Sequence, residues 1–193
     1  MDKALRYLKN YLLWIKSVPT EKSKDRISKE SQSLSEYDVV ILSDVSLKYC
    51  DVTSLRNFLE NDVKQKGKSM ILTGGYGLTA EYNRELGEEN LGGKIGKRFE
   101  NVVKIAENEH NIGIGLTFKG FNYFEPKNAD VIARWEEDGS PALIVNKIGK
   151  GKIIIFTSDC SPAWGTPSIE TEGFRDMWKQ IMEKFILSKN LAS

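Results

Sequence analysis

The sequence predicts an α/β domain built around a mostly parallel β-sheet. Two continuous apolar segments, residues 37–44 (YDVVILSD) and 69–73 (SMILT), are typical of strands that are buried on both faces. Between them, residues 54–66 carry apolar side chains at helical spacing. A strand, a helix and a second strand with this spacing form a parallel crossover unit, which is the building block of the α/β class.

The residues beside this helix predict where it begins and ends. The side-chain oxygen of Thr53 can accept a hydrogen bond from the free backbone N–H groups of a first turn, so Thr53 is the predicted N-cap. Gly67 can adopt the left-handed conformation that ends many helices. After the second strand, residues 81–97 are rich in charge and glycine, which predicts a solvent-exposed excursion over one end of the sheet.

The rest of the chain continues the alternation of strands and helices within one predicted domain, residues 1–193. The tight turn at residues 148–152 predicts a hairpin between the two strands that flank it. Trp178 lies on the apolar stripe of the last helix and is predicted to be core. The other predicted strands are residues 102–105, 129–135, 142–146 and 152–158, and the other predicted helices are residues 3–17 and 171–187.

Composition narrows the class of partner. Lys and Arg number 28 and Asp and Glu number 27, so the net charge of +1 gives no general electrostatic reason to bind nucleic acid or a membrane. No apolar segment is long enough to span a bilayer, and the N-terminus lacks the apolar region of a secretory signal. Cys50 and Cys160 are too few and too far apart for a disulfide framework, which predicts free thiols in a cytoplasmic protein.

Five segments of the chain point together to one known family: residues 37–44, 70–77, 92–94 (GGK), 120–126 and 149–165. The strongest of these signals is at residues 156–165 (FTSDCSPAWG). In these segments the chain resembles the putative glutamine amidotransferases of the class I glutamine amidotransferase-like superfamily. The resemblance runs from about residue 37 to the C-terminus. That family is related to ThuA-like and beta-galactosidase trimerisation domains.

The resemblance implies a flavodoxin-like, doubly wound sheet with helices on both faces. Members of the family begin with a strand ahead of the first helix, whereas this chain begins directly with the helix. We therefore expect that strand to be missing, because the start has been lost or because the N-terminus is rearranged. A sheet without one of its first strands exposes an edge or an apolar face. We therefore expect either that residues 1–36 depart from the family or that a partner subunit covers the gap, as in a homo-oligomer.

The resemblance also implies a site for a glutaminase, and the residues there do not fit one. A class I glutaminase carries its nucleophilic cysteine on a tight turn after a strand, where the next backbone N–H stabilises the oxyanion. Gly75 stands at the corresponding place in residues 73–77. The partner histidine belongs near residues 158–164, which contain none, and the one histidine, His110, lies in a charged segment. Glutaminase activity is therefore not expected.

Two other residues at the end of the last strand are candidate catalytic groups. Cys160 and Asp159 follow the strand at residues 152–158, and α/β folds bind ligands at this end of their strands. Asp159 would raise the pKa of a neighbouring thiol, and no His or Lys is adjacent to activate it. An unreactive buried thiol is the alternative for Cys160. No ligand spacing typical of a metal site is present, and neither a metal nor a cofactor is expected.

We interpret the chain as a non-glutaminase member that binds a small polar ligand, such as a sugar or a carboxylate, at the carboxyl ends of the strands. The alternative is a hydrolase or transferase that uses Cys160 or Asp159. Residues 74–77 (GGYG) either cradle an anion or form a turn that needs positive φ. Trp164 either walls the pocket or seals a subunit contact. The predicted ligand-binding residues are Asp44, Gly74, Gly75, Tyr76, Asn122, Asp159 and Trp164.

Overall fold

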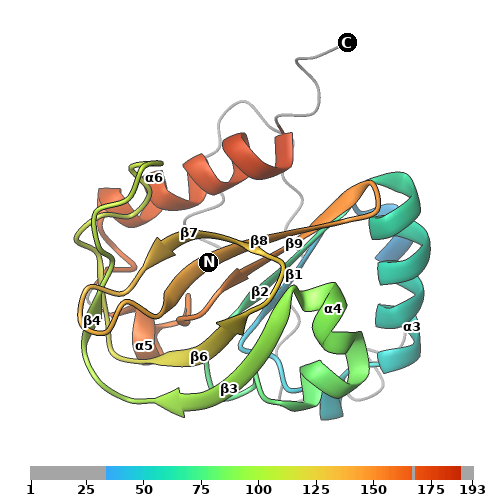
Figure 1. The fold of residues 1–193 in the computed structure, drawn as a ribbon, viewed down its shortest axis with the longest axis horizontal. Helices are drawn as coiled ribbons and strands as arrows, with labels where there is room; N and C mark the ends of the chain where they lie inside the picture. The colour runs from blue at the N-terminus through green and yellow to red at the C-terminus, as the bar shows by residue number, and fades with distance from the viewer. Residues whose placement is uncertain (1–33, 167, 188–193) are drawn as a thin grey trace.

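A five-stranded sheet runs through the molecule in the order β1-β2-β9-β8-β7 (Figure 1). The computed structural model describes residues 34–166 and 168–187, so the helix predicted at residues 3–17 lies outside the described residues. β1, β2 and β9 are parallel, whereas β8 and β7 join the sheet antiparallel. The sheet is therefore mixed, which is compatible with a flavodoxin-like fold. Its strands are β1 (Val39–Ser43), β2 (Ser69–Thr73), β7 (Asp130–Arg134), β8 (Pro141–Ile148) and β9 (Gly151–Phe156).

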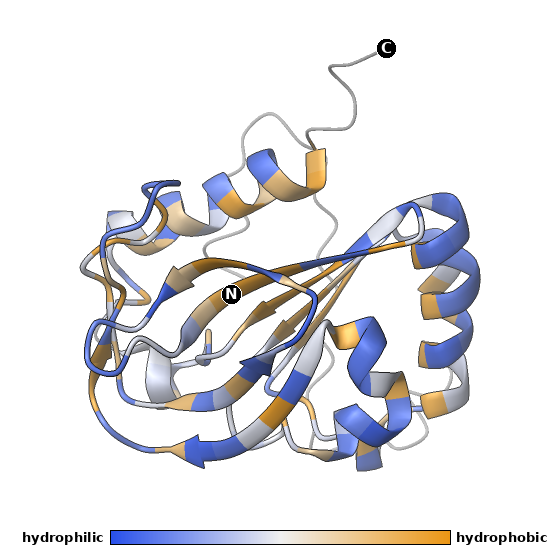
Figure 2. Cartoon of the chain, in the orientation of Figure 1, coloured by the Kyte–Doolittle hydropathy of each residue, from blue (hydrophilic) through white to orange (hydrophobic). Residues whose placement is uncertain are grey.

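Helices pack against both faces of this sheet. Successive side chains of a strand point to opposite faces. Met70 and Leu72 of β2 accordingly join the buried cluster formed with α3 and η4, whereas Ile71 joins the cluster formed with α6. Figure 2 shows apolar strands between helices with hydrophilic residues on their outer sides. The segments concerned are α3 (Val52–Asn57), which continues as the π-helix η4 (Phe58–Lys64), and α6 (Glu172–Ile181), which continues as the π-helix η6 (Met182–Ile186).

Short elements outside the sheet form two antiparallel ribbons, β3 with β6 and β4 with β5. Across the described residues, no helix is long and apolar enough to cross a membrane. The predicted hairpin between β8 and β9 is confirmed. The remaining elements are η2 (Leu34–Glu36), η3 (Leu47–Tyr49), η5 (Asn83–Gly87), α4 (Glu88–Leu91), β3 (Gly93–Phe99), β4 (Val103–Lys104), β5 (Thr117–Phe118), β6 (Phe121–Pro126) and α5 (Pro162–Gly165).

The segment at residues 81–97 is not the solvent-exposed excursion that its charge predicted. It folds into η5, α4 and most of β3, and Tyr82, Leu86, Leu91 and Ile95 are buried. Tyr82, Leu86 and Leu91 recur about once per turn of the helical part, and Ile95 follows on β3, so one apolar side packs against the core. The prediction was wrong because it weighed the total charge of the segment and not this spacing.

The N-cap of α3 is Asp51, so the prediction of Thr53 was wrong. Asp51 Oδ1 accepts hydrogen bonds from the backbone N–H of Thr53 at 3.0 Å and of Ser54 at 3.2 Å. The chain enters the helix at Val52, and a carboxylate also interacts favourably with the positive end of the helix dipole. The predicted stop at Gly67 is confirmed, because Gly67 has a φ of 81° and donates to the Val63 carbonyl.

Asp62 is a buried acid that connects η4 to η2, and replacing it with asparagine is expected to destabilise the fold. Its carboxylate accepts from Ser35 Oγ at 2.9 Å and pairs with Lys66 and Lys68 at 3.0 and 3.2 Å. Burial alone would raise the pKa of Asp62, but these partners outweigh it and lower the pKa. Asp62→Asn weakens charge-assisted hydrogen bonds, which predicts a loss of about 1–3 kcal/mol in the free energy of unfolding near neutral pH.

The pH dependence follows from the direction of this shift. A carboxyl group with a lowered folded-state pKa stabilises the protein above its unfolded-state pKa, and that stabilisation is lost as the pH falls through the folded-state pKa. Urea unfolding at neutral pH and at about pH 2 should therefore show the two proteins converging in acid. Asp130→Asn is the control, because Asp130 is an exposed acid that also pairs with a lysine. Its Oδ2 lies 3.7 Å from Nζ of Lys147. An Asp62→Asn loss that is equal at both pH values would contradict the prediction.

Candidate functional site

The candidate site lies where three neighbouring parallel strands end. Asp44 directly follows β1, Gly74 directly follows β2, and Asp159 comes three residues after β9. Because these strands are adjacent and run in the same direction, their carboxyl ends meet at one edge of the sheet. This is the edge at which open α/β sheets bind ligands.

The turn that follows β2 contains Gly74, Gly75 and Gly77 and forms part of the site. The N–H of Gly74 donates to the carbonyls of Phe156 and Ser158 at 2.8 and 2.9 Å, so the turn is joined to the end of β9. A Cβ at position 74 would lie 2.0 Å from the carbonyl oxygen of Thr157. Gly74 is thus required by a close backbone approach.

Asn122, from β6, holds the same turn from the opposite side. Its Oδ1 accepts from the N–H of Gly75 at 2.8 Å, and its Nδ2 donates to the carbonyls of Gly75 and Leu78 at 3.2 and 2.9 Å. The side chain is buried and these bonds use most of its capacity. Asn122 therefore belongs to the framework that shapes the site.

Asp44 is held in an uncommon backbone conformation beside this turn. Its φ is 51°, in the left-handed region that few residues other than glycine adopt. Its Oδ1 accepts from the N–H of Gly77 at 2.5 Å, and a Cβ at Gly75 would lie 2.3 Å from its carboxyl carbon. Burial raises the pKa of Asp44. The hydrogen bond from Gly77 lowers this pKa, whereas the charge of the nearby Asp159 raises it further. Strained residues of this kind are concentrated at functional sites.

The exposed ring of Tyr76, in the turn beside Asp44, has a second aromatic ring and a guanidinium group as neighbours. Tyr76 is 51% exposed, and its ring centroid lies 5.8 Å from that of the buried Trp164. The guanidinium carbon of Arg98 lies 4.2 Å from the centroid of the Tyr76 ring. The charge of Arg98 also lowers the pKa of Asp44, against the effect of burial. The exposed face of the site therefore combines a carboxyl group, a phenol and a guanidinium group.

Arg98 is the residue of this site that sequence reasoning missed. It lies on β3, opposite Asn122 in the β3–β6 register. The segment before it was interpreted as a polar excursion, so its strand was not recognised. A bulge interrupts the β3–β6 register between Ile95 and Arg98. The regular alternation of side chains that reveals a strand is therefore not kept, so the strand signal is weak.

Asp159 and Cys160 are both buried, and their geometry does not favour a nucleophile. The N–H of Ser161 donates to Asp159 Oδ1 at 2.8 Å, and the Ser161 hydroxyl bonds to Oδ2. Burial raises the pKa of Asp159 against these hydrogen bonds. Cys160 is completely buried, and burial together with the charge of Asp159 raises the pKa of its thiol well above its ordinary value. The thiolate, and not the thiol, is the reactive form of cysteine.

Alkylation of the native protein should therefore spare Cys160. Cys50 is partly exposed, but burial and the charge of Glu81 raise its pKa to about 11, so it should react slowly near neutral pH. We expect iodoacetamide, followed by peptide mass spectrometry, to modify Cys160 only after denaturant unfolds the chain. Modification of Cys160 in the native protein at a rate near that of free cysteine would contradict this expectation.

All seven residues predicted for ligand binding lie around this edge, in two groups. Gly74, Gly75, Asn122, Asp159 and Trp164 are buried and form its framework, whereas Tyr76 is exposed and Asp44 partly so. Whether any of them binds a ligand stays a prediction. Within the described residues no group of three or more His, Cys, Asp or Glu side chains could hold a metal ion.

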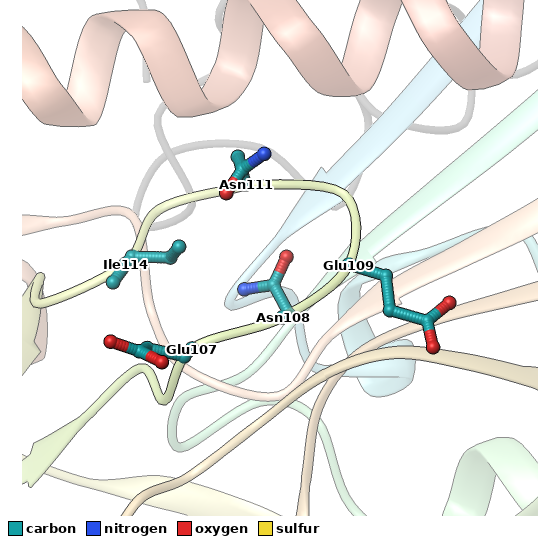
Figure 3. Close-up of a pocket in the computed structure, with 5 residues that line it drawn as sticks. All are labelled: Glu107, Asn108, Glu109, Asn111 and Ile114. Carbon is teal, nitrogen blue, oxygen red and sulfur yellow. The ribbon is translucent and has the colours of Figure 1, made fainter.

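A depression of about 490 Å³ lies elsewhere, on the loop between β4 and β5 (Figure 3). This loop packs against the last helical segment, since the ring centroids of His110 and Phe185 lie 5.9 Å apart. None of the residues around the carboxyl ends of the strands lines the depression. The residues that line it are Glu107, Asn108, Glu109, Asn111 and Ile114.

Comparison with protein families supports the resemblance inferred from the sequence. Residues 96–187 match a family described as "Putative glutamine amidotransferase". This amidotransferase-like family match begins within β3 and ends at the last helical residue described, so it includes Arg98, Asn122, Asp159 and Trp164. The further relation to ThuA-like domains stays a prediction. A comparison with curated proteins finds no match.

Solved structures share the fold of this chain. A cytoplasmic protein of Salmonella typhimurium LT2 aligns with a TM-score of 0.74 at 22% identity, over 96% of this chain and 86% of that one. A second cytoplasmic protein of Salmonella typhimurium aligns with a TM-score of 0.75 at 21% identity, over 94% and 85%. A GH42 beta-galactosidase from G. stearothermophilus aligns with a TM-score of 0.54 at 19% identity, over 79% of this chain and 22% of that chain. At these identities the likeness shows the fold alone.

Proposed function

We propose that this amidotransferase-like protein is a cytoplasmic binding domain that takes a small polar ligand at the carboxyl ends of β1, β2 and β9. The observation that carries the proposal is the conformation of Asp44. Its left-handed backbone aims a carboxyl group with a raised pKa at the edge where Tyr76 is exposed. A fold that needed only a turn there could place asparagine or glycine at this position without keeping a partly buried charge.

Hydrolysis of glutamine is not part of this proposal. Gly75 occupies the position of the nucleophile, has a φ of 133° and is pressed against Asp44, so a side chain there would collide with the carboxyl group. The single histidine lies on the β4–β5 loop beside Phe185. An assay of ammonia release from glutamine should show no activity above a blank. Release that disappears in a Cys160→Ala variant would instead support the hydrolase or transferase alternative.

The binding proposal is tested by nuclear magnetic resonance with small polar compounds. Galactose, succinate and glycerol would each be titrated into labelled protein while the backbone amides of Gly75, Tyr76 and Gly77 are followed. We expect at least one compound to shift these three amides in a saturable manner. Tyr76→Ala should weaken that binding. Tyr123→Ala is the matched control, because Tyr123 is a second exposed tyrosine and lies on the face of β6 opposite Asn122. If none of the three compounds shifts these amides, the proposal is overturned.

The predicted homo-oligomer stays a prediction. The exposed large apolar side chains nearest the ribbon of β3 and β6 are Phe99, Val102 and Tyr123. A subunit contact would bury surface of this kind. Light scattering coupled to size-exclusion chromatography measures the mass directly, and a mass equal to that of one chain would exclude the oligomer.

A further inference from the structure

Two contacts hold the guanidinium group of Arg98 at the site. Its guanidinium carbon lies over the ring of Tyr76, 4.2 Å from the ring centroid. Its Nε forms an ion pair with the carboxylate of Glu100 at 3.0 Å. Tyr76 is in turn supported by Trp164, at 5.8 Å. The side chain is thus held on two sides while 40% of it remains exposed.

The contacts of Arg98 leave one side of the guanidinium open. The contact with Glu100 is through Nε, and in the described part of the chain the two terminal nitrogens of Arg98 have no hydrogen-bond partner. A guanidinium group presents its donors as a planar fork that matches the two oxygens of a carboxylate. An arginine that is already stacked and oriented loses less side-chain freedom when it binds such a group.

The surroundings of Arg98 favour an anion with a second polar group. Arg98 lies over the ring of Tyr76, and the N–H of the next residue, Gly77, donates to Asp44, so a ligand carboxylate on Arg98 would place its neighbouring atoms near Asp44 and the Gly75–Gly77 turn. Asp44 can hydrogen-bond a hydroxyl or amine of the ligand. Monoanions without a second polar group would make only the first of these contacts.

We propose that Arg98 determines the specificity of this site and selects small molecules that carry a carboxylate together with a second polar group. This inference rests on the proposed binding function and narrows its ligand class. Inorganic phosphate offers the same negative charge but a tetrahedral array of oxygens, and neutral sugars offer hydroxyl groups without the charge.

The test is a resonance titration at fixed ionic strength with citrate, malate, inorganic phosphate and galactose as separate probes. The amides of Gly75, Tyr76 and Gly77 report binding. In wild-type protein we expect citrate or malate to bind more tightly than phosphate or galactose. Arg98→Gln should weaken carboxylate binding by at least about tenfold, as the loss of a charge-assisted hydrogen bond predicts. Lys97→Gln removes the same charge from the adjacent exposed residue and should change affinity by less than about twofold.

Arg98→Lys separates charge from geometry. It retains the positive charge but lacks the planar fork, so it should bind carboxylates nearly as poorly as Arg98→Gln. Spectra of each variant that overlay with wild type away from the site confirm that the fold is intact, and partial exposure of Arg98 makes this the expected result.

The remaining outcomes each decide the matter. Equal weakening by Lys97→Gln and Arg98→Gln would show a general charge effect and overturn the inference. Tighter binding of phosphate than of either carboxylate would also overturn it. Saturable shifts with galactose but with neither carboxylate would overturn it and leave the proposed function standing. If no probe shifts the three amides, both proposals fail.

Discussion

Replacing Gly74 with alanine is expected to lower the free energy of unfolding by about 3 kcal/mol, because the added methyl group meets backbone and not a mobile side chain. The new Cβ would lie 2.0 Å from the carbonyl oxygen of Thr157 and 2.7 Å from Asn122 Oδ1. Relief requires the end of β2 to move away from the end of β9. That movement would stretch the hydrogen bonds from Gly74 to Phe156 and Ser158.

The same substitution should also disturb the candidate site. Asp44 and Tyr76 are positioned by the turn that begins at Gly74, so the amides of Gly75–Gly77 should move even without ligand. Urea unfolding gives the loss of stability, and Gly139→Ala is the matched control. Gly139 has a φ of 70° and no atom near its missing Cβ, so alanine there carries only the conformational cost of about 1 kcal/mol. Equal losses at the two positions would show that the collision at Gly74 is relieved easily.

Replacing Trp178 with alanine is expected to destabilise the domain by about 3–5 kcal/mol, as for other large aromatic residues removed from a core. Trp178 is completely buried on α6. Its ring lies 5.9 Å from that of Phe156 on β9 and 6.3 Å from that of Phe174. The substitution therefore leaves a cavity between the helix and the sheet, at the interface through which α6 covers one face.

The measurement is again urea unfolding, with Tyr123→Ala as the control for loss of an aromatic ring. Tyr123 is 41% exposed, so its removal leaves no enclosed cavity and should cost less than about 1 kcal/mol. Trp178→Phe keeps most of the volume and should fall between the two. A loss for Trp178→Ala no greater than that for Tyr123→Ala would mean that α6 contributes little to the fold.

The strands at the centre of the sheet could be predicted from the sequence alone. Residues 69–73 were predicted to be a strand and are β2, because a short apolar run that is buried on both faces has few other structures available. The helix after β1, the stop at Gly67, the hairpin of β8 and β9 and the buried position of Trp178 were also predicted. Each depends on interactions within a few residues or on a strong apolar period.

The sequence also indicated which residues would gather at one edge, but not what each would do there. Asp44, Gly74 and Asp159 follow strands that proved to be adjacent and parallel, so their convergence follows from strand order. Asn122 and Trp164 were named as ligand contacts, and the structure gives Asn122 a framework role that depends on the approach of β6 to the turn. That approach is a tertiary contact between residues 47 positions apart.

The remaining features depend on contacts between segments that are distant in the chain. The spacing of Tyr82, Leu86 and Leu91 indicates an apolar side, but the sequence does not show which core that side faces. The place of Arg98 over Tyr76 depends on the pairing of β3 with β6, which brings together segments more than 20 residues apart. The antiparallel pairing of β7 with β8 was not predicted either. Side-chain period and turn chemistry act over short separations, whereas strand pairing and the composition of a site are decided by contacts between distant segments.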